Sequence, residues 1–141
     1  MHAKGTDIAC LALGACATAD DIATVPLEAE RLVGTWDLAQ VGSRKLSRAI
    51  WLEFRASGEL HGGVSCNRFS GTYEVQPPRI VYSDPIIITA AGCGPGWPEN
   101  GPLRERAEEV VFRDDPLVGL SPDGRFLVMR GEEDSLLFIR R

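Results

Sequence analysis

The run Cys66-Asn67-Arg68-Phe69-Ser70-Gly71 tells more about the fold than any other stretch of these 141 residues. No helix or strand periodicity requires the order of its side chains, which are a thiol, an amide, a cation, an aromatic ring and a hydroxyl followed by glycine. Gly71 suits a turn or a bulge. We interpret the run as a junction in a sheet where single side chains have fixed roles. Asn67 bonds nearby backbone, Phe69 fills the core, and Arg68 faces water or pairs with a carboxylate.

Short strands are expected around this run, because apolar and polar side chains alternate there with a period of two. The alternation is clearest at 50–54, and residues 59–64 are expected to return as its partner after a turn at Ala56-Ser57-Gly58. Gly62-Gly63 within that partner predicts a bulge or a tight bend. A short helical turn at 27–33 is expected to precede the first strand. The remaining strands on this side of the chain are predicted at 35–41, 72–75, 80–82 and 86–89.

One helix is expected at 102–112, because four apolar side chains fall on one face of that segment. These side chains are Leu103, Ala107, Val110 and Val111. Three more strands are predicted after it, at 117–120, 126–130 and 135–140. Helices do not alternate with strands, which argues against a doubly wound parallel sheet. The predicted fold is mainly β, in the α+β class: an antiparallel sheet of about eight short strands curled into an open or closed β-barrel, with one helix packed on it.

The composition favours a single globular domain and argues against several functions. The net charge of −5 leaves no basic face for nucleic acid. A metal site is not expected, because the only histidines are His2 and His61 and no Cys-x-x-Cys occurs. No nucleophile elbow or phosphate loop is present, and we expect no catalytic residues and no cofactor. A small hydrolase or inhibitor is the least favoured alternative.

The first 16 residues have the pattern of a secretory signal. Lys4 precedes an apolar stretch at 8–15, and Leu13-Gly14-Ala15-Cys16 resembles a bacterial lipobox, in which the cysteine is lipidated. The stretch is too short to span a bilayer, which takes about 20 apolar residues. We expect 1–16 to be a lipoprotein signal, 17–26 a flexible tether and 27–141 the folded domain. The protein would then be lipid-anchored on the periplasmic face of a bacterial envelope. If the segment is no signal, the alternative is a cytoplasmic protein.

Several motifs along the globular part resemble the META/HslJ family of small bacterial proteins. They are Leu32-Val33-Gly34-Thr35-Trp36-Asp37-Leu38, Leu52-Glu53-Phe54, the run from Cys66 extended to Thr72-Tyr73, Thr89-Ala90-Ala91-Gly92-Cys93, the acidic helix around Glu105, and Leu136-Leu137-Phe138. The resemblance implies a compact β-barrel-like fold with one helix, in the cell envelope and without established catalysis. It identifies Gly34, Trp36, Asn67, Phe69 and Gly71 as structural positions. The fold is also similar to a lipid-binding pilotin of secretion systems.

Cys66 and Cys93 lie 27 positions apart, and in an oxidising envelope a disulfide between them is expected. Closing that loop would stabilise the fold by roughly 3–4 kcal/mol in the chain-entropy model. The alternative is two buried free thiols. Trp36 is expected to plug one end of the barrel. Trp97, in a glycine- and proline-rich loop, is the candidate exposed contact.

Two functions remain open from the sequence. The first is a non-enzymatic binding or scaffold domain of the META/HslJ type, with a protein partner or a lipid ligand, in envelope stress or secretion. The second is a lipocalin-like carrier of a small apolar ligand, because Gly34-Thr35-Trp36 after a short helical turn also resembles the opening of that family. A ligand-sized cavity inside the barrel, about 300 Å³ or more, would favour the carrier, and a filled core would favour the scaffold.

Overall fold

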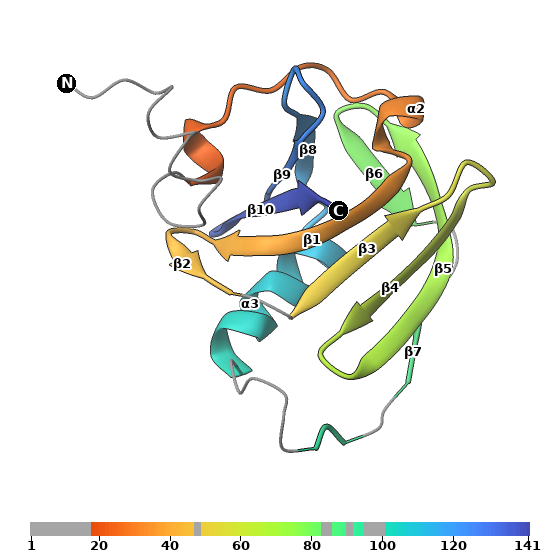
Figure 1. The fold of residues 1–141 in the computed structure, drawn as a ribbon, viewed down its shortest axis with the longest axis vertical. Coiled ribbons are helices and arrows are strands. Elements are labelled where there is room, and N and C mark those ends of the chain that lie inside the picture. The colour runs from red at the N-terminus through yellow and green to blue at the C-terminus, as the bar shows by residue number, and fades with distance from the viewer. Residues whose placement is uncertain (1–17, 47–48, 83–85, 90–91, 95–100) are drawn as a thin grey trace.

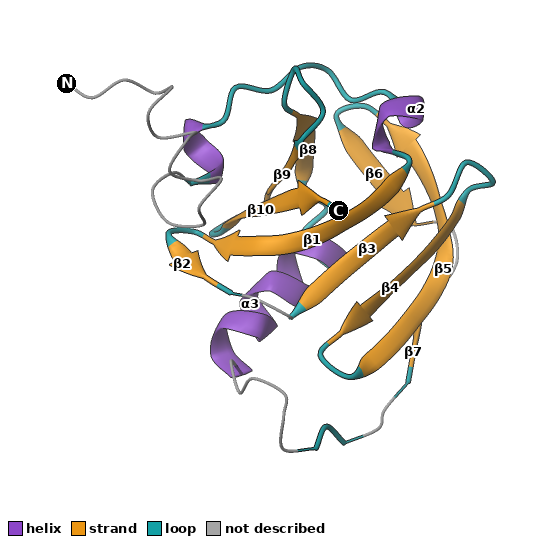
Figure 2. Ribbon diagram, viewed as in Figure 1, coloured by secondary structure: helices purple, strands orange, loops and turns teal. Residues whose placement is uncertain are grey.

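A computed structural model describes residues 18–46, 49–82, 86–89, 92–94 and 101–141. Strands make up most of the regular secondary structure in this part of the chain (Figure 2). The strands are β1 (Gly34–Val41), β2 (Arg44–Lys45), β3 (Ile50–Phe54), β4 (Glu59–Val64), β5 (Asn67–Gln76), β6 (Arg79–Tyr82), β7 (Ile87–Ile88), β8 (Leu117–Leu120), β9 (Phe126–Arg130) and β10 (Ser135–Arg140). The helices are η1 (Ala19–Asp21), α2 (Ala29–Leu32) and α3 (Gly101–Phe112).

The strands form an antiparallel sheet that curls into a nearly closed barrel (Figure 1). Eight of them follow the order β6-β5-β4-β3-β1-β10-β9-β8, while β2 pairs with β1 and β7 pairs with β5. The two ends of this order approach each other: the Val118 amide donates to the Pro78 carbonyl at 2.8 Å, and Arg79 pairs with Asp115 at 3.2 Å. The predicted fold class, a mainly antiparallel barrel with one main helix, is confirmed.

The interior of the barrel is filled by large apolar side chains. Alternate residues of the strands point inward, as in β3, where Ile50, Leu52 and Phe54 are buried while the two residues between them are half-buried. Helix α3 packs against β1, β9 and β10. The largest fully buried side chains are Trp36, Phe54, Phe138, Leu32, Leu46, Leu52, Leu60, Leu120, Leu127, Met129 and Leu136. At native packing density such a core leaves little room for a ligand among these side chains.

The run that begins at Cys66 belongs to a long strand. The turn lies one step earlier, at Ser65 and Cys66, where Ser65 has a φ of 54°. β5 starts at Asn67 and pairs with β4 without a register break, from Val64↔Asn67 to Glu59↔Thr72. The interpretation of the whole run as a junction, with a strand only from residue 72, was therefore wrong. Pairing with β4 extends β5 through residues whose apolar and polar side chains do not alternate in the sequence.

The expectation of a bulge at Gly62-Gly63 was also wrong. Both glycines pair in continuous register with β3 and with β5. Their lack of a side chain serves close packing, because a Cβ at Gly62 would lie 2.3 Å from the Phe69 ring. The irregularity of the sheet falls in β1, where the pairing with β10 shifts register between Leu38 and Gln40.

The described part of the segment predicted as a tether contributes to the core. Ala19 and Ile22 are buried and form a second apolar cluster with Phe126, Val128 and Leu137. Further along, the Val25 amide donates to the Leu120 carbonyl at 2.8 Å. The chain therefore packs on the sheet from η1 onward, before the predicted domain boundary at residue 27.

Candidate functional site

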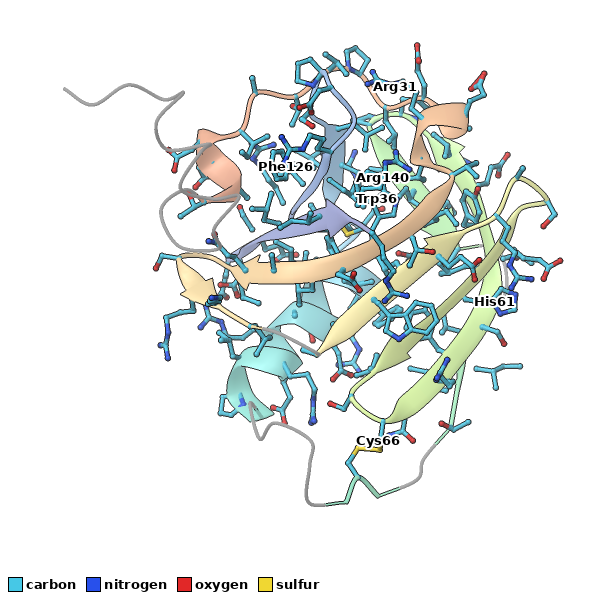
Figure 3. All side chains as sticks on the ribbon, in the orientation of Figure 1. Arg31, Trp36, His61, Cys66, Phe126 and Arg140 are labelled. Atoms are coloured by element: carbon cyan, nitrogen blue, oxygen red, sulfur yellow. A yellow bond between two sulfur atoms is a disulfide. The ribbon has the colours of Figure 1, made fainter. Side chains whose placement is uncertain are left out.

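The predicted structural tryptophan, Trp36, is fully buried at the start of β1. Its indole Nε1 donates to the Leu32 carbonyl at 2.9 Å, and the Arg140 guanidinium lies 4.1 Å from the centre of its ring. Arg140 in turn donates to the carbonyls of Val33 at 2.8 Å and Gly124 at 2.9 Å, and also to that of Arg31. Figure 3 shows Arg31, Trp36 and Arg140 gathered at one end of the sheet.

This cluster explains the glycine of the Gly34-Thr35-Trp36 motif. Gly34 has a φ of +137°, and a Cβ there would lie 2.5 Å from Nη1 of Arg140. Burial lowers the pKa of the Arg140 guanidinium, and the nearby Arg31 lowers it further. Among the described residues, backbone carbonyls and an aromatic face hold Arg140. These contacts join the α2 turn to the β8–β9 turn, which is a structural arrangement.

A disulfide joins Cys66 to Cys93 and ties the turn before β5 to the loop after β7 (Figure 3). Beside it, Oδ1 of Asn67 accepts a hydrogen bond from the Thr89 hydroxyl at 3.0 Å. Phe69 is buried and makes an edge-to-face contact with Phe112 at the end of α3. The cysteine and the two motif residues therefore hold the β7 side of the sheet and the helix against β5.

The other predicted positions fall into two groups. Gly71 lies on β5, where a Cβ would meet Ile86 Cδ1 at 2.9 Å, so close packing also accounts for this glycine. Cys16 and Trp97 lie outside the described residues. The lipid anchor and the exposed contact at Trp97 stay predictions.

Polar clusters among the described residues show no arrangement typical of catalysis. His61 lies on β4 with Nε2 3.0 Å from Oε1 of Glu59, and this hydrogen bond lowers the pKa of Glu59. Within the described ranges, no three His, Cys, Asp or Glu side chains converge in a way that would hold a metal ion. None of the described helices is long and apolar enough to cross a bilayer.

A tryptophan that the sequence did not single out lies on the outer face of the sheet. Cross-strand pairing places Asp37, Trp51, Gly63 and Arg68 in one row across β1, β3, β4 and β5. A Cβ at Gly63 would lie 2.3 Å from Nε1 of Trp51, which shows that the indole lies over this glycine. Trp51 is half-buried. A large aromatic residue in the polar phase of an alternating strand is the sequence signal that could have identified it.

Two arginines flank the Trp51 ring, each with its guanidinium carbon 5.3 Å from the ring centre. Arg141 binds Asp37 through two hydrogen bonds, of 2.6 and 3.0 Å, which raise its pKa. The exposed Arg68 makes no ion pair within the described part of the chain. We name the surface formed by this row (Asp37, Trp51, Gly63 and Arg68) together with Arg141 the Trp51 face.

Two surface hollows lie elsewhere. One, of about 500 Å³, follows the line where β6 and β8 approach each other, and Pro78, Leu117 and Arg130 are among its lining residues. The other, of about 260 Å³, is strongly acidic and is lined by Arg106, Glu109, Asp114, Glu132, Glu133 and Asp134. Neither is lined by the large side chains that fill the barrel.

The model of the META domain family matches residues 30–102, just over half of the chain. The matched region contains the Trp36 motif, Trp51, Arg68 and both bridged cysteines. None of the curated proteins matches this sequence.

Solved structures share the fold at low sequence identity. A protein solved by NMR has a TM-score of 0.62 at 17% identity, over 81% of this chain and 95% of that one. A Burkholderia xenovorans protein, also solved by NMR, has a TM-score of 0.58 at 18% identity, over 85% and 92%. A DUF4847 family protein from Bacteroides vulgatus has a TM-score of 0.52 at 12% identity, over 78% and 94%. At such identities the likeness extends to the fold alone.

Proposed function

Because this chain belongs to the META domain family, we propose that it is a small, non-enzymatic binding or scaffold domain that acts at the bacterial cell envelope through the Trp51 face. The observation that carries the proposal is a half-buried tryptophan between two arginines on the outside of a barrel whose inside is filled. Tryptophan and arginine dominate the energetics of binding surfaces. A carrier would need room in the interior, which the core side chains occupy.

The envelope location is supported by two features of the chain. The Cys66–Cys93 bridge suits an oxidising compartment. The sequence around Cys16 has the pattern of a lipoprotein signal. We propose that Cys16 carries the lipid anchor. A single acyl chain holds a protein to a membrane only marginally, so the anchor would need the several chains that lipoproteins carry.

Metabolic labelling with radioactive palmitate tests the anchor. Label is expected on the full-length protein and on the Cys10→Ala variant, which keeps the lipobox cysteine. It should be missing from Cys16→Ala. Equal labelling of Cys16→Ala, or an unlabelled parent protein, would rule out the anchor.

The binding surface is tested with full-length protein extracted from its own cells and analysed by native mass spectrometry. A bound ligand or partner is expected with the parent protein and should be lost on Trp51→Ala. The control is Arg113→Gln, at a side chain directly after α3 that is 75% exposed and should leave binding unchanged. If Trp51→Ala retains the same bound species, the surface has been placed wrongly.

A further inference from the structure

We propose that the Trp51 face binds an acidic saccharide, with the indole as the stacking platform and Arg68 as the partner of the sugar carboxylate. The inference rests on the proposed binding function and names the class of its ligand. Carbohydrate rings that carry a carboxylate combine a flat C–H face, several hydroxyl groups and one negative charge. Each of these three features has a counterpart among the described residues.

The platform is the solvent-facing side of the indole. Trp51 lies over Gly63, where a Cβ would be 2.3 Å from Nε1 and 3.0 Å from both Cδ1 and Cε2. The backbone of β4 therefore supports one face of the ring. The opposite face carries the negative side of the ring quadrupole, which attracts the weakly positive C–H groups of a sugar ring.

The charge complement comes from Arg68. Its guanidinium carbon lies 5.3 Å from the indole centre, its side chain is exposed, and no carboxylate among the described residues pairs with it. Arg141, the second arginine beside the ring, is already bound to Asp37. A planar guanidinium binds a carboxylate through two parallel hydrogen bonds. A ligand that stacks on Trp51 can therefore place one carboxylate on Arg68.

Acceptors for hydroxyl groups surround the platform. Glu53 lies two residues after Trp51 on β3 and His61 two residues before Gly63 on β4, so both share the outer face at about 6.8 Å along the strands. Asp37 adjoins the ring on β1. The row from Asp37 to Arg68 crosses three strand spacings, about 14 Å.

This distribution favours a sugar over an acidic peptide. A protein interface is usually apolar at its centre and depleted of charge there. Here one aromatic ring is surrounded by charged side chains, of which Asp37 pairs with Arg141 and Glu53 with Arg55. Among the described residues around this ring, Arg68 is then the single cation left for a ligand, which suits one carboxylate better than a peptide with several acidic residues. The hydroxyl groups of a sugar can also donate to the carboxylates of Asp37 and Glu53.

The test is a titration of the full-length protein with D-galacturonate, a sugar ring with one carboxylate, and with D-galactose as its neutral counterpart. The indole N–H signal of Trp51 is followed by NMR and assigned with Trp51→Phe, because Trp36 and Trp97 also carry indoles. D-Galacturonate is expected to shift that signal and to bind at least about tenfold tighter than D-galactose, the difference typical of one charged hydrogen-bonding partner. Arg68→Gln should remove this preference, whereas Arg113→Gln should keep it.

The other outcomes separate this inference from the proposed function. Equal binding of both sugars, unaffected by Arg68→Gln, contradicts the acidic ligand but leaves Trp51 as a binding surface. If neither sugar moves the Trp51 signal and a protein is lost from Trp51→Ala in native mass spectrometry, the ligand is a protein and the saccharide is excluded. If neither experiment depends on Trp51, both the inference and the binding surface are wrong.

Discussion

Arg140 holds several elements of the fold together through electrostatic contacts. Its guanidinium donates to three carbonyls and covers an indole, so backbone dipoles and the ring quadrupole hold it in place. Burial lowers its pKa, yet an arginine keeps its charge at any physiological pH. The buried Trp36 has its Nε1 donor satisfied by Leu32. These contacts connect the first strand, the last strand and two turns.

Arg140→Met is therefore expected to lower the free energy of unfolding by about 2–4 kcal/mol, because it removes charged hydrogen bonds and the cation–π contact. Urea denaturation measures this loss. Arg113→Met is the control, since its side chain is 75% exposed, and it should change stability by less than about 0.5 kcal/mol. Equal stabilities of the two variants would contradict the role assigned to Arg140.

Ser121 gives a second expectation, which concerns pH. Its buried hydroxyl donates to Oδ1 of Asp123 at 2.8 Å and accepts from the Phe126 amide at 3.0 Å. The hydrogen bond from Ser121 lowers the pKa of Asp123 below its ordinary value of 3.8. Because the pKa of Asp123 is lower in the folded than in the unfolded protein, its ionised carboxylate stabilises the fold above pH 3.8. This stabilisation is lost as the pH falls through the lowered pKa.

Ser121→Ala should cost about 1–2 kcal/mol at neutral pH, because the buried Phe126 amide loses its partner. The variant should also lose less stability than the parent protein on acidification, since Asp123 no longer gains from the hydroxyl. Urea titrations at neutral pH and at a pH below 3.8 measure both effects. Parallel pH profiles for the two proteins would show that Ser121 does not act on Asp123.

At the scale of elements, β4 is a strand whose glycines admit large neighbours. Gly62 makes room for the Phe69 ring on the inner side, and Gly63 lies beneath Trp51 on the outer side. Their two side chains, if present, would point to opposite faces of the sheet. The two glycines thus allow a large ring to pack on each side of β4, Phe69 in the core and Trp51 on the outer face. Phe69 extends the inner contact to Phe112 of α3.

Gly62→Ala should destabilise the fold by about 1–3 kcal/mol or more, the range for overpacking a core. A Cβ there would lie 2.3 Å from the Phe69 ring and 2.4 Å from the Trp51 carbonyl, and that carbonyl belongs to the backbone. Gly92→Ala is the matched control, because a Cβ at Gly92 meets nothing within 4 Å. Thermal unfolding by circular dichroism would detect the difference. A Gly62→Ala protein as stable as Gly92→Ala would mean that the strand shifts to relieve the contact.

At the scale of the whole molecule, the barrel buries two apolar clusters. The larger one fills the interior, and the smaller one lies between the outer side of β9 and β10 and the segment that begins at η1. Figure 1 shows this segment beside β10 before it runs over the β8–β9 end towards α2. Residues from 18 onward thus pack against the sheet, and we expect them to unfold together with it.

Ile22→Ala is expected to cost about 2–4 kcal/mol, because it removes a buried side chain from the smaller cluster. Ile87→Ala, at a side chain that is 71% exposed, makes the same chemical change at the surface and should have little effect. Chemical denaturation of the full-length variants compares the two. If Ile22→Ala were as stable as the parent protein, residues 18–26 would be the tether predicted from the sequence.

Much of the fold could be predicted from contiguous residues. The alternation at 50–54, the apolar face of α3 and the turn at Asp123-Gly124 each depend on side chains a few positions apart. The bridge between Cys66 and Cys93 was expected from the oxidising context of a cell envelope. Cross-strand effects were missed: the length of β5, the regular pairing of Gly62-Gly63 and the packing of Ile22 depend on partners distant in the sequence.

The amino-acid sequence was enough to indicate where most strands and the main helix lie, because local periodicity and turn residues depend on nearest neighbours. Which side chains meet could be seen only in the folded protein. Arg140 reaches the Val33 carbonyl across 107 positions, and the Trp51 face combines residues from β1, β3, β4, β5 and the end of the chain. Such contacts follow from strand register and barrel closure, which are properties of the whole packed sheet.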